Sequence, residues 1–227
     1  MEMKKIAFIL MGFVLAAMPL SAQNYRNSKY YNPRTGHLDY GYKKDAGDIY
    51  YGLRIGPAFS YVNSDDSRLD GGKWQTGLNL GFVAGIPLSD TTPLYLETGL
   101  SYIEKGGKKN LAGGKKMTYD LNYLEVPIVA KYKYDIDSDL SIQPFFGGYF
   151  GVGVSGKIKN FEEREAQSSF RDTNFKRVDG GLRLGCGLAY DMFYCDLTYD
   201  IGLANICHDT FDSSHNGSLQ LNFGVNF

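Results

Sequence analysis

The chain has 227 residues and a balanced charge, with 24 Lys and Arg against 25 Asp and Glu, so no net field points to nucleic acid or to an acidic partner. It is rich in glycine (28 residues) and tyrosine (18 residues). Beyond the N-terminus no apolar run reaches about 18 residues, which excludes a helical membrane span.

The first 22 residues have the pattern of a secretory signal peptide. Lys4 and Lys5 precede the apolar stretch "IAFILMGFVLAAMPL", and the small residues Ser21 and Ala22 follow it. This order predicts cleavage after Ala22 and export of the mature protein, with a retained membrane anchor as the alternative. Residues 23–48 are polar and rich in tyrosine without a sustained period, and we expect a flexible segment there.

From residue 49 onward, apolar residues alternate with small or polar ones, which is the period of a β-strand. Eight such segments are predicted, at 49–61, 74–88, 94–104, 119–134, 140–157, 176–190, 193–206 and 217–227. Short links at 89–93, 135–139 and 191–192 are typical of hairpin turns, and longer links lie between them at 62–73, 105–118, 158–175 and 207–216. This pattern predicts an all-β fold over 49–227, an eight-stranded antiparallel up-and-down transmembrane β-barrel.

Two kinds of barrel share this alternation, a water-soluble one with its apolar face inside and a membrane one with that face outside. The interior of an eight-stranded barrel is only just wide enough for side chains to fill it, and the large apolar residues of these strands exceed that volume. The opposite face carries most of the strand glycines, with few bulky residues such as Tyr95, Phe145 and Tyr149. The apolar face is therefore predicted to face lipid, where a closed barrel satisfies its backbone.

Aromatic residues near the strand ends fit the two girdles that membrane barrels place at the interfaces. We assign Tyr51, Tyr132, Tyr134, Tyr190, Phe193 and Phe227 to the periplasmic rim, and Phe59, Tyr61, Trp74 and Tyr102 to the outer rim. The last strand alternates and carries Phe223, Val225 and Phe227, a pattern that resembles the C-terminal signal for barrel insertion. The barrel-insertion machinery is therefore an expected partner, and the cell outer membrane is the expected location.

Five stretches of the chain carry a resemblance to a known family. They are "YLEVPIVAKYKY" (123–134), "PFFGGYFGVGVSGK" (144–157), "DGGLRLGCGLAY" (179–190), "CDLTYDIGLANI" (195–206) and "LQLNFGVNF" (219–227). The chain resembles the PorT-like outer-membrane β-barrel family over about 49–227. The resemblance implies an exported barrel, and the namesake of that family is linked to a protein secretion system.

The inward face is predicted to hold a balanced set of charges. The set consists of Arg54, Lys131, Lys133, Arg177 and Arg183 against Glu97, Glu125, Asp179, Asp196 and Asp200. A charge-selective pore would need an excess of one sign, so we expect paired side chains that plug the lumen. Bulk conduction is not expected, because open channels need about sixteen strands. An acid–base pair among the carboxylates is the less favoured alternative.

Two links carry candidate binding residues. The link "KGGKKNLAGGKKMT" (105–118) has no acid and holds Lys105, Lys108, Lys109, Lys115 and Lys116, which predicts either an outer-loop contact for anionic lipopolysaccharide or a solvated loop. The link "CHDTFDSSH" (207–215) holds His208 and His215 with two aspartates, but the spacing fits no metal-site pattern. No metal or cofactor is predicted. Cys186, Cys195 and Cys207 are too few for a disulfide framework, and the first two fit small apolar positions.

No catalytic motif, phosphate loop or nucleic-acid module appears in the sequence. We therefore expect a non-enzymatic outer-membrane protein with a structural or interaction role through its outer loops. Outer-membrane lipid, lipopolysaccharide and other envelope proteins are the candidate partners. A small ligand-binding or transport barrel and an outer-membrane barrel enzyme are the alternatives.

Overall fold

The computed structural model describes residues 30–31, 38–39, 49–65, 73–89, 92–110, 116–137, 139–159, 167–170, 175–208 and 213–227. The chain divides into two compact units, one of Met1–Asp45 with Phe227 and one of Ala46–Asn226. In the first unit, β1 (Tyr30–Tyr31) pairs antiparallel with β2 (Leu38–Asp39). The predicted signal peptide lies outside the described residues, as does most of the segment 23–48.

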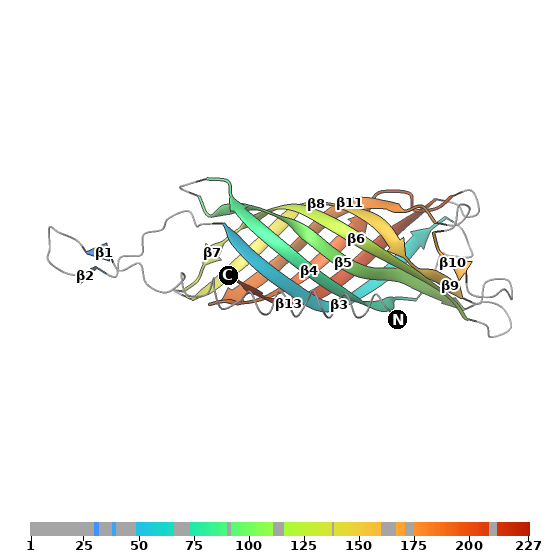
Figure 1. Ribbon diagram of the computed structural model, residues 1–227, viewed down its shortest axis with the longest axis horizontal. Helices are drawn as coiled ribbons and strands as arrows, with labels where there is room; N and C mark the ends of the chain where they lie inside the picture. The colour runs from blue at the N-terminus through green and yellow to red at the C-terminus, as the bar shows by residue number, and fades with distance from the viewer. Residues whose placement is uncertain are drawn as a thin grey trace. The chain divides into compact units, whose positions relative to one another are not determined.

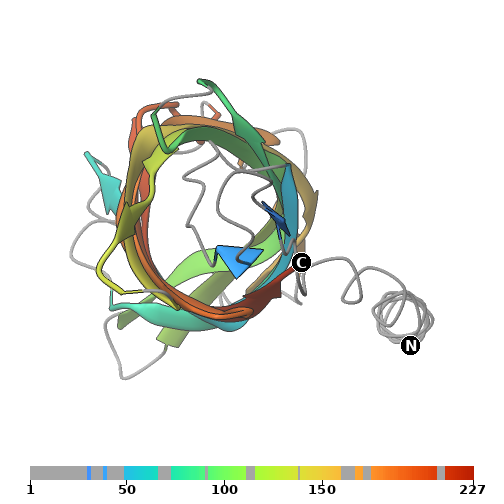
Figure 2. The same ribbon diagram turned by 90° about the vertical axis from the view of Figure 1, so that its left-hand side faces the viewer.

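The second unit is a closed barrel of eight long antiparallel strands, as predicted (Figures 1 and 2). The strands are β3 (Tyr50–Ser64), β4 (Gln75–Pro87), β5 (Leu94–Asn110), β6 (Lys116–Tyr132), β8 (Leu140–Ser155), β11 (Val178–Tyr190), β12 (Phe193–Gly202) and β13 (Ser214–Asn226). Each strand pairs with the next, and β13 returns to pair with β3 from Ser214↔Ser64 to Asn226↔Gly52. The last strand is thus the one that closes the ring. In the described part of the chain, no helix is long and apolar enough to cross a membrane.

Short turns join the strands at one end of the barrel. The hairpin between β11 and β12 is the tightest, because Tyr190 pairs directly with Phe193. Asp191 in this turn has a φ of 51°, in the left-handed region that Asp tolerates better than most residues. Between β6 and β8, the short strand β7 (Tyr134–Asp135) pairs with the start of β8.

At the other end the strands run further than the sequence predicts. β5 continues to Asn110 and β6 begins at Lys116, so the predicted link 105–118 shrinks to 111–115. The link 158–175 contains β10 (Gln167–Ser168) and most of β9 (Lys157–Lys159), and β9 pairs with the start of β6. We call this end the mouth section and define it by its buried apolar interior: Ala58, Val62, Ile103, Met117, Tyr119, Leu121, Tyr123, Ile158, Phe170, Phe175, Ile206 and Cys207.

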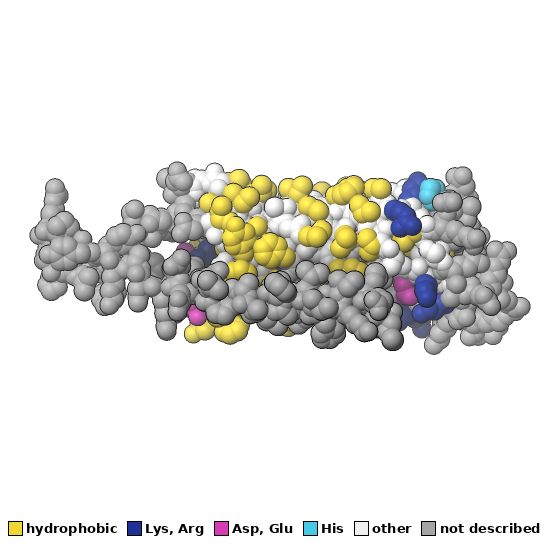
Figure 3. Space-filling view, in the orientation of Figure 1, with side chains coloured by type: hydrophobic (Ala, Val, Ile, Leu, Met, Phe, Trp, Pro, Cys, Tyr) yellow, Lys and Arg dark blue, Asp and Glu magenta, His cyan; other side chains and the backbone are white. Residues whose placement is uncertain are grey.

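The rest of the barrel, which we call the belt section, has an apolar exterior. Large outward side chains such as Ile128 and Phe146 are 55% and 59% exposed. On the face that Figure 3 shows, hydrophobic side chains form a band along the middle of the barrel. Of the residues assigned to the rims, Trp74 is exposed at the mouth end, and those exposed at the turn end are Tyr51, Tyr132, Tyr134, Tyr190 and Phe193. The prediction that the apolar face points outward is confirmed.

Strand β6 shows how the two sections differ. Its outward residues Leu124, Val126 and Ile128 are apolar, and every second residue between them is buried. From Tyr123 back to Met117 the alternation continues but its polarity reverses, because the apolar residues are now the inward ones. An exterior that touches water needs polar side chains, so this reversal marks the level at which the strand leaves the lipid.

Inward glycines make room for the few bulky groups of the interior. A Cβ at Gly185 would overlap the ring of Phe145, and a Cβ at Gly187 would overlap the hydroxyl of Tyr194. Both rings are buried inside the barrel. The narrow interior therefore holds large aromatic residues because their neighbours on the adjacent strand have no side chain.

Candidate functional site

The barrel interior is crossed by charged side chains in two groups. The group nearer the short turns, which we call the inner cluster, is centred on Glu97 of β5. Its Oε2 accepts hydrogen bonds from the Tyr50 hydroxyl (2.5 Å) and from Lys131 Nζ (2.6 Å). Lys131 also donates to the Tyr194 hydroxyl at 2.9 Å. The cluster joins four strands, and its ions are buried with their partners in place, as buried charges require.

Arg54 belongs to the inner cluster and lies at the seam where the barrel closes. Its Nη2 donates to Asn226 Oδ1 (2.6 Å) on β13 and lies 3.9 Å from Glu97 Oε2. The guanidinium also lies over the Tyr194 ring, 3.8 Å from its centroid. Arg54 of the first long strand thus contacts β13, β5 and β12, so it links the seam to the strands on both sides of it.

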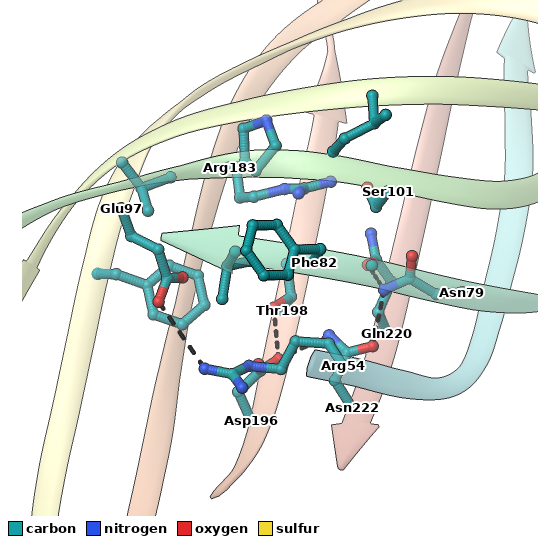
Figure 4. A pocket seen from close by; sticks show the side chains of 16 residues that line it. Arg54, Asn79, Phe82, Glu97, Ser101, Arg183, Asp196, Thr198, Gln220 and Asn222 are labelled. Atoms are coloured by element: carbon teal, nitrogen blue, oxygen red, sulfur yellow. Dashed lines mark hydrogen bonds and ion pairs between the residues drawn. The ribbon is translucent and has the colours of Figure 1, made fainter. Parts of the chain in front are cut away.

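Between the two groups lies a small cavity of about 40 Å³ that is lined by both polar and apolar side chains. Asp196 accepts hydrogen bonds from Thr198 (2.7 Å) and Asn222 (2.8 Å), and Asn79 donates to Asn222 at 2.8 Å. Figure 4 shows Arg54 and these side chains converging on it from several strands. Such a volume has room for about three water molecules and is far below the ~300 Å³ of a small-molecule pocket.

The group nearer the mouth, the outer cluster, holds two cations and three carboxylates. Arg183 donates to both oxygens of Asp200 through Nε (2.7 Å) and Nη2 (2.8 Å), and Nη2 also reaches Glu125 at 2.8 Å. Lys105 Nζ lies 2.5 Å from Glu125 Oε1, 3.3 Å from Asp179 and 3.8 Å from Asp200. The paired fork of Arg183 fixes the orientation of Asp200.

Neutral groups complete the shell around the outer cluster. Asp200 accepts hydrogen bonds from Gln220 (2.7 Å) and Ser218 (3.1 Å), and Asp179 accepts one from Asn216 (2.9 Å). The ammonium of Lys105 also lies 4.3 Å from the centroid of the Tyr149 ring. These contacts hold the carboxylates apart from each other and give the excess negative charge several donors.

The structure places eight of the ten residues predicted for the lumen network inside the barrel: Arg54, Glu97, Glu125, Lys131, Asp179, Arg183, Asp196 and Asp200. Two are placed elsewhere. Lys133 follows the end of β6, is 39% exposed and pairs with Asp135 at 3.5 Å. Arg177 precedes β11, is exposed and donates to the carbonyl of Gly153 at 2.9 Å. Both lie beyond the strand whose alternation was extended to them.

The prediction for Lys105 was wrong in the opposite direction. It was placed in an outer loop as an anion-binding residue, but its side chain is fully buried inside the barrel. Since β5 continues past residue 104, Lys105 keeps the inward parity of Ser101 and Ile103. That parity was the signal available in the sequence. With Lys105 included, the buried set of the described residues has four cations (Arg54, Lys105, Lys131, Arg183) and five carboxylates, so it is not the balanced five against five that was predicted.

The other lysines of that link have different positions. Lys108 is exposed and Lys109 half-exposed on β5, and Lys116 is the first residue of β6. Lys115 lies outside the described residues. Among the described side chains of this set, Lys108 and Lys109 therefore remain the candidates for contact with an anion outside the barrel.

The histidine link shows no metal geometry in the residues the structure covers. Nδ1 of His215 lies 3.1 Å from the Ala204 carbonyl and its Nε2 lies 3.4 Å from the Ser213 hydroxyl. Among the described residues, no group of three or more His, Cys, Asp or Glu is placed to hold a metal ion. Cys186, Cys195 and Cys207 form no disulfide, and Cys186 lies at the exterior as an apolar position.

A closed antiparallel barrel with an apolar belt and a polar interior defines an outer-membrane β-barrel protein. The chain belongs to the outer membrane protein beta-barrel domain family, whose model matches residues 21–208. The cell outer membrane is therefore its location. No curated protein matches the sequence.

Several solved structures are similar to this chain. Ail, the attachment invasion locus protein of Yersinia pestis, solved in complex with the heparin analogue sucrose octasulfate, is 19% identical with a TM-score of 0.42. Neisserial surface protein A is 15% identical with a TM-score of 0.49, and a major outer membrane protein from Thermus thermophilus is 16% identical with a TM-score of 0.48. Each similarity covers 80% of this chain and 100% of the other.

Proposed function

We propose that this protein is a barrel with a closed lumen that works by presenting its outer end to other components of the cell envelope, and that it is neither a pore nor an enzyme. The observation that carries the proposal is the filling of the interior. The inner and outer clusters cross the lumen, and the cavity between them measures about 40 Å³. In the part of the barrel that the structure describes, this volume is well below the ~300 Å³ of a small-molecule site.

The mouth section adds a second barrier in support of closure. Phe175 stacks on Tyr119 with ring centroids 5.6 Å apart, and Phe170 meets Tyr123 edge-on at the same distance. All four rings are buried above the outer cluster. A solute entering from outside would have to displace these rings before it reached the charges. Displacing the rings breaks their packing contacts, and entering the clusters breaks ion pairs between buried charges.

Single-channel recording tests the closed lumen. We expect the purified protein in a planar bilayer to give no resolved conductance steps, with insertion checked by the faster gel mobility of the unboiled barrel recovered from the bilayer. Reproducible steps from the inserted wild-type protein would overturn the proposal and favour a transport function. The double variant Phe170→Ala with Phe175→Ala is the matched comparison, because it removes two of the four buried rings of the mouth section and leaves both ion clusters intact.

The interaction role is tested at the link between β5 and β6. Replacing 111–115 with a Gly-Ser sequence of equal length changes the link and leaves both strands and Lys105 in place. We expect an envelope component that co-purifies with the wild-type protein from outer membranes to be lost from this variant. Unchanged co-purification would remove this link from the proposed contact surface.

Export and insertion remain predictions of the same proposal. We expect the mature protein recovered from outer membranes to begin at Gln23, and a chain that still starts with Met1 would contradict a cleaved signal peptide. Phe223, which is 52% exposed on β13, forms the proposed insertion signal together with Val225 and Phe227. The PorT-like resemblance adds a link to protein secretion as a prediction only, which a secretion assay in a deletion strain would test.

A further inference from the structure

Three lysines share one level of the sheet in the mouth section. Lys73, just before β4, faces Lys108 of β5 across an antiparallel bridge, with backbone N–O distances of 2.6 and 3.2 Å. Lys108 pairs with Thr118 of β6, and Thr118 pairs with Lys159 of β9. Residues directly opposite each other lie on the same face of a sheet, so these side chains form one row across four adjacent segments of chain. We call Lys73, Lys108 and Lys159 the lysine row.

Among the described residues, two lysines of the row lack a carboxylate partner. Like charges directly opposite each other on neighbouring strands destabilise a sheet. Asp120 Oδ2 lies 3.7 Å from Lys159 Nζ and partly offsets the charge of that lysine, while Asp120 Oδ1 accepts a hydrogen bond from Gln75 at 2.7 Å. Within the described residues, no carboxylate lies within ion-pair distance of Lys73 or Lys108. An anion placed over the row would relieve the repulsion between the two facing ammonium groups.

The row lies directly beyond the aromatic rim. Trp74 follows Lys73 in the chain, is 51% exposed and has its ring centroid 4.9 Å from that of Tyr61. Tyr61 in turn shares a hydrogen bond of 2.8 Å with the hydroxyl of Tyr199. Aromatic rims of this kind lie at the level of lipid headgroups. Figure 3 shows Lys and Arg side chains beyond the apolar band, at the end that carries β9.

The exterior below the rim is apolar along the same strands. Leu78 of β4 is 40% exposed and Leu100 of β5 is 51% exposed. The parts of one lipid would therefore meet three surfaces in turn. Its acyl chains would contact Leu78 and Leu100, its headgroup would contact Trp74, and its phosphates would contact the lysine row. A free anion would use the row alone, and only an amphiphile in the outer leaflet matches all three surfaces.

We propose that the lysine row and Trp74 bind an outer-leaflet glycolipid with a phosphorylated headgroup. The lysines neutralise the phosphate, and the indole packs against the headgroup sugar at the interface. This site lies on the outside of the barrel wall, so it does not depend on whether the lumen is closed.

Trp74 is the single tryptophan of the chain and serves as the reporter. The wild-type barrel in phosphatidylcholine nanodiscs is titrated with bis-phosphorylated lipid A, and the Trp74 emission is followed. We expect a saturable shift whose apparent dissociation constant rises about thirtyfold in Lys73→Gln with Lys108→Gln, because each lysine near an anionic lipid surface contributes about a factor of five. The matched control, Lys176→Gln with Arg177→Gln, removes the same charge at the same end and should bind as the wild type does.

Three results would overturn the proposal. An equal loss in the control variant would mean that net charge attracts the lipid without a site. An equal response to dephosphorylated lipid A would remove the phosphate from the recognition, and an equal response to inorganic phosphate alone would remove the lipid. All variants must keep the faster gel mobility of the unboiled barrel, and Lys108→Gln alone, which does not neighbour Trp74 in the chain, checks that the reporter itself is unaltered.

Discussion

The belt section and the mouth section are built from the same strands with opposite polarity. On β6 of the belt, Glu125 and Lys131 point inward and Ile128 outward, whereas in the mouth Tyr119 and Leu121 point inward and Thr118 lies on the outer face. The pairing of β6 with β5 keeps one register through both sections, and the pairing with β8 shifts register between Asn122 and Tyr123 without changing which residues face inward. The difference therefore comes from the medium outside the wall, because lipid takes the apolar face in the belt and water takes the polar face in the mouth.

Lys105 stands where the two sections meet, and its replacement should have the largest effect. Its backbone pairs with Leu121 of the mouth, while its ammonium reaches the carboxylates of the outer cluster. Lys105→Met keeps the apolar stem. Among the described residues it leaves Arg183 as the one cation within ion-pair distance of Glu125 and Asp200, and it leaves Asp179 with none. We expect a loss of about 3–5 kcal/mol in the free energy of unfolding, measured from the urea midpoint of the unboiled gel band.

The control for Lys105→Met is the same substitution three residues further along β5. Lys108 is exposed in the mouth section, so Lys108→Met should change the unfolding free energy by no more than about 0.5 kcal/mol. The double variant Lys105→Met with Asp179→Asn should recover part of the loss, because it removes the carboxylate whose one ion-pair partner among the described residues is Lys105. Equal stability of the two single variants would contradict the buried position of Lys105.

A second pair of substitutions locates the lipid boundary on one face of one strand. Ile128→Lys puts a charge into the belt, where a lysine facing the bilayer midplane costs about 2–4 kcal/mol. Thr118→Lys puts the same charge on the same face in the mouth, where we expect a change below about 1 kcal/mol. The unfolding free energies of both variants are measured in lipid vesicles.

Repeating the measurement in vesicles of thinner lipid sharpens the comparison. The cost of Ile128→Lys should fall as the midplane moves closer to an interface, while that of Thr118→Lys should stay the same. Similar costs for both variants would place the two positions in one environment and would contradict the reversal of polarity at Tyr123.

The sequence predicts which residues of a belt strand face inward. It does not predict where a strand ends or where its outer face changes from lipid to water. A period of two assigns every residue of a strand to a face, which correctly placed residues as far apart as Arg54 and Asp200 inside the barrel. It does not say where a strand ends, so Arg177 and Lys133 received an inward position beyond their strands. It also treats lipid and water alike, and for this reason the apolar interior of the mouth was missed although Met117, Tyr119, Leu121 and Tyr123 alternate in the sequence.

Partners within the interior were beyond prediction for a different reason. Which carboxylate meets which cation depends on the stagger between strands, and that stagger is set by the closure of the whole ring. Lys105 of β5 and Asp179 of β11 lie 74 residues apart in the chain, yet their charged groups are 3.3 Å apart. No local pattern in the sequence carries that distance.

The smallest effect is expected at Lys133, and it separates strand from turn at the periplasmic rim. Lys131 and Lys133 are two residues apart, so alternation alone would give both the same inward position. Lys131 is buried between Glu97 and Tyr194, whereas Lys133 is 39% exposed beside Asp135, which is 43% exposed. Because an exposed ion pair contributes little, Lys133→Gln should change the unfolding free energy by less than about 0.5 kcal/mol. Lys131→Gln should cost several times more, since among the described residues it leaves Glu97 with only the more distant Arg54, 3.9 Å away, as a counter-ion. If the two variants unfold at the same urea concentration, the strand extends to Lys133 and the inner cluster holds one more cation than the contacts of Glu97 indicate.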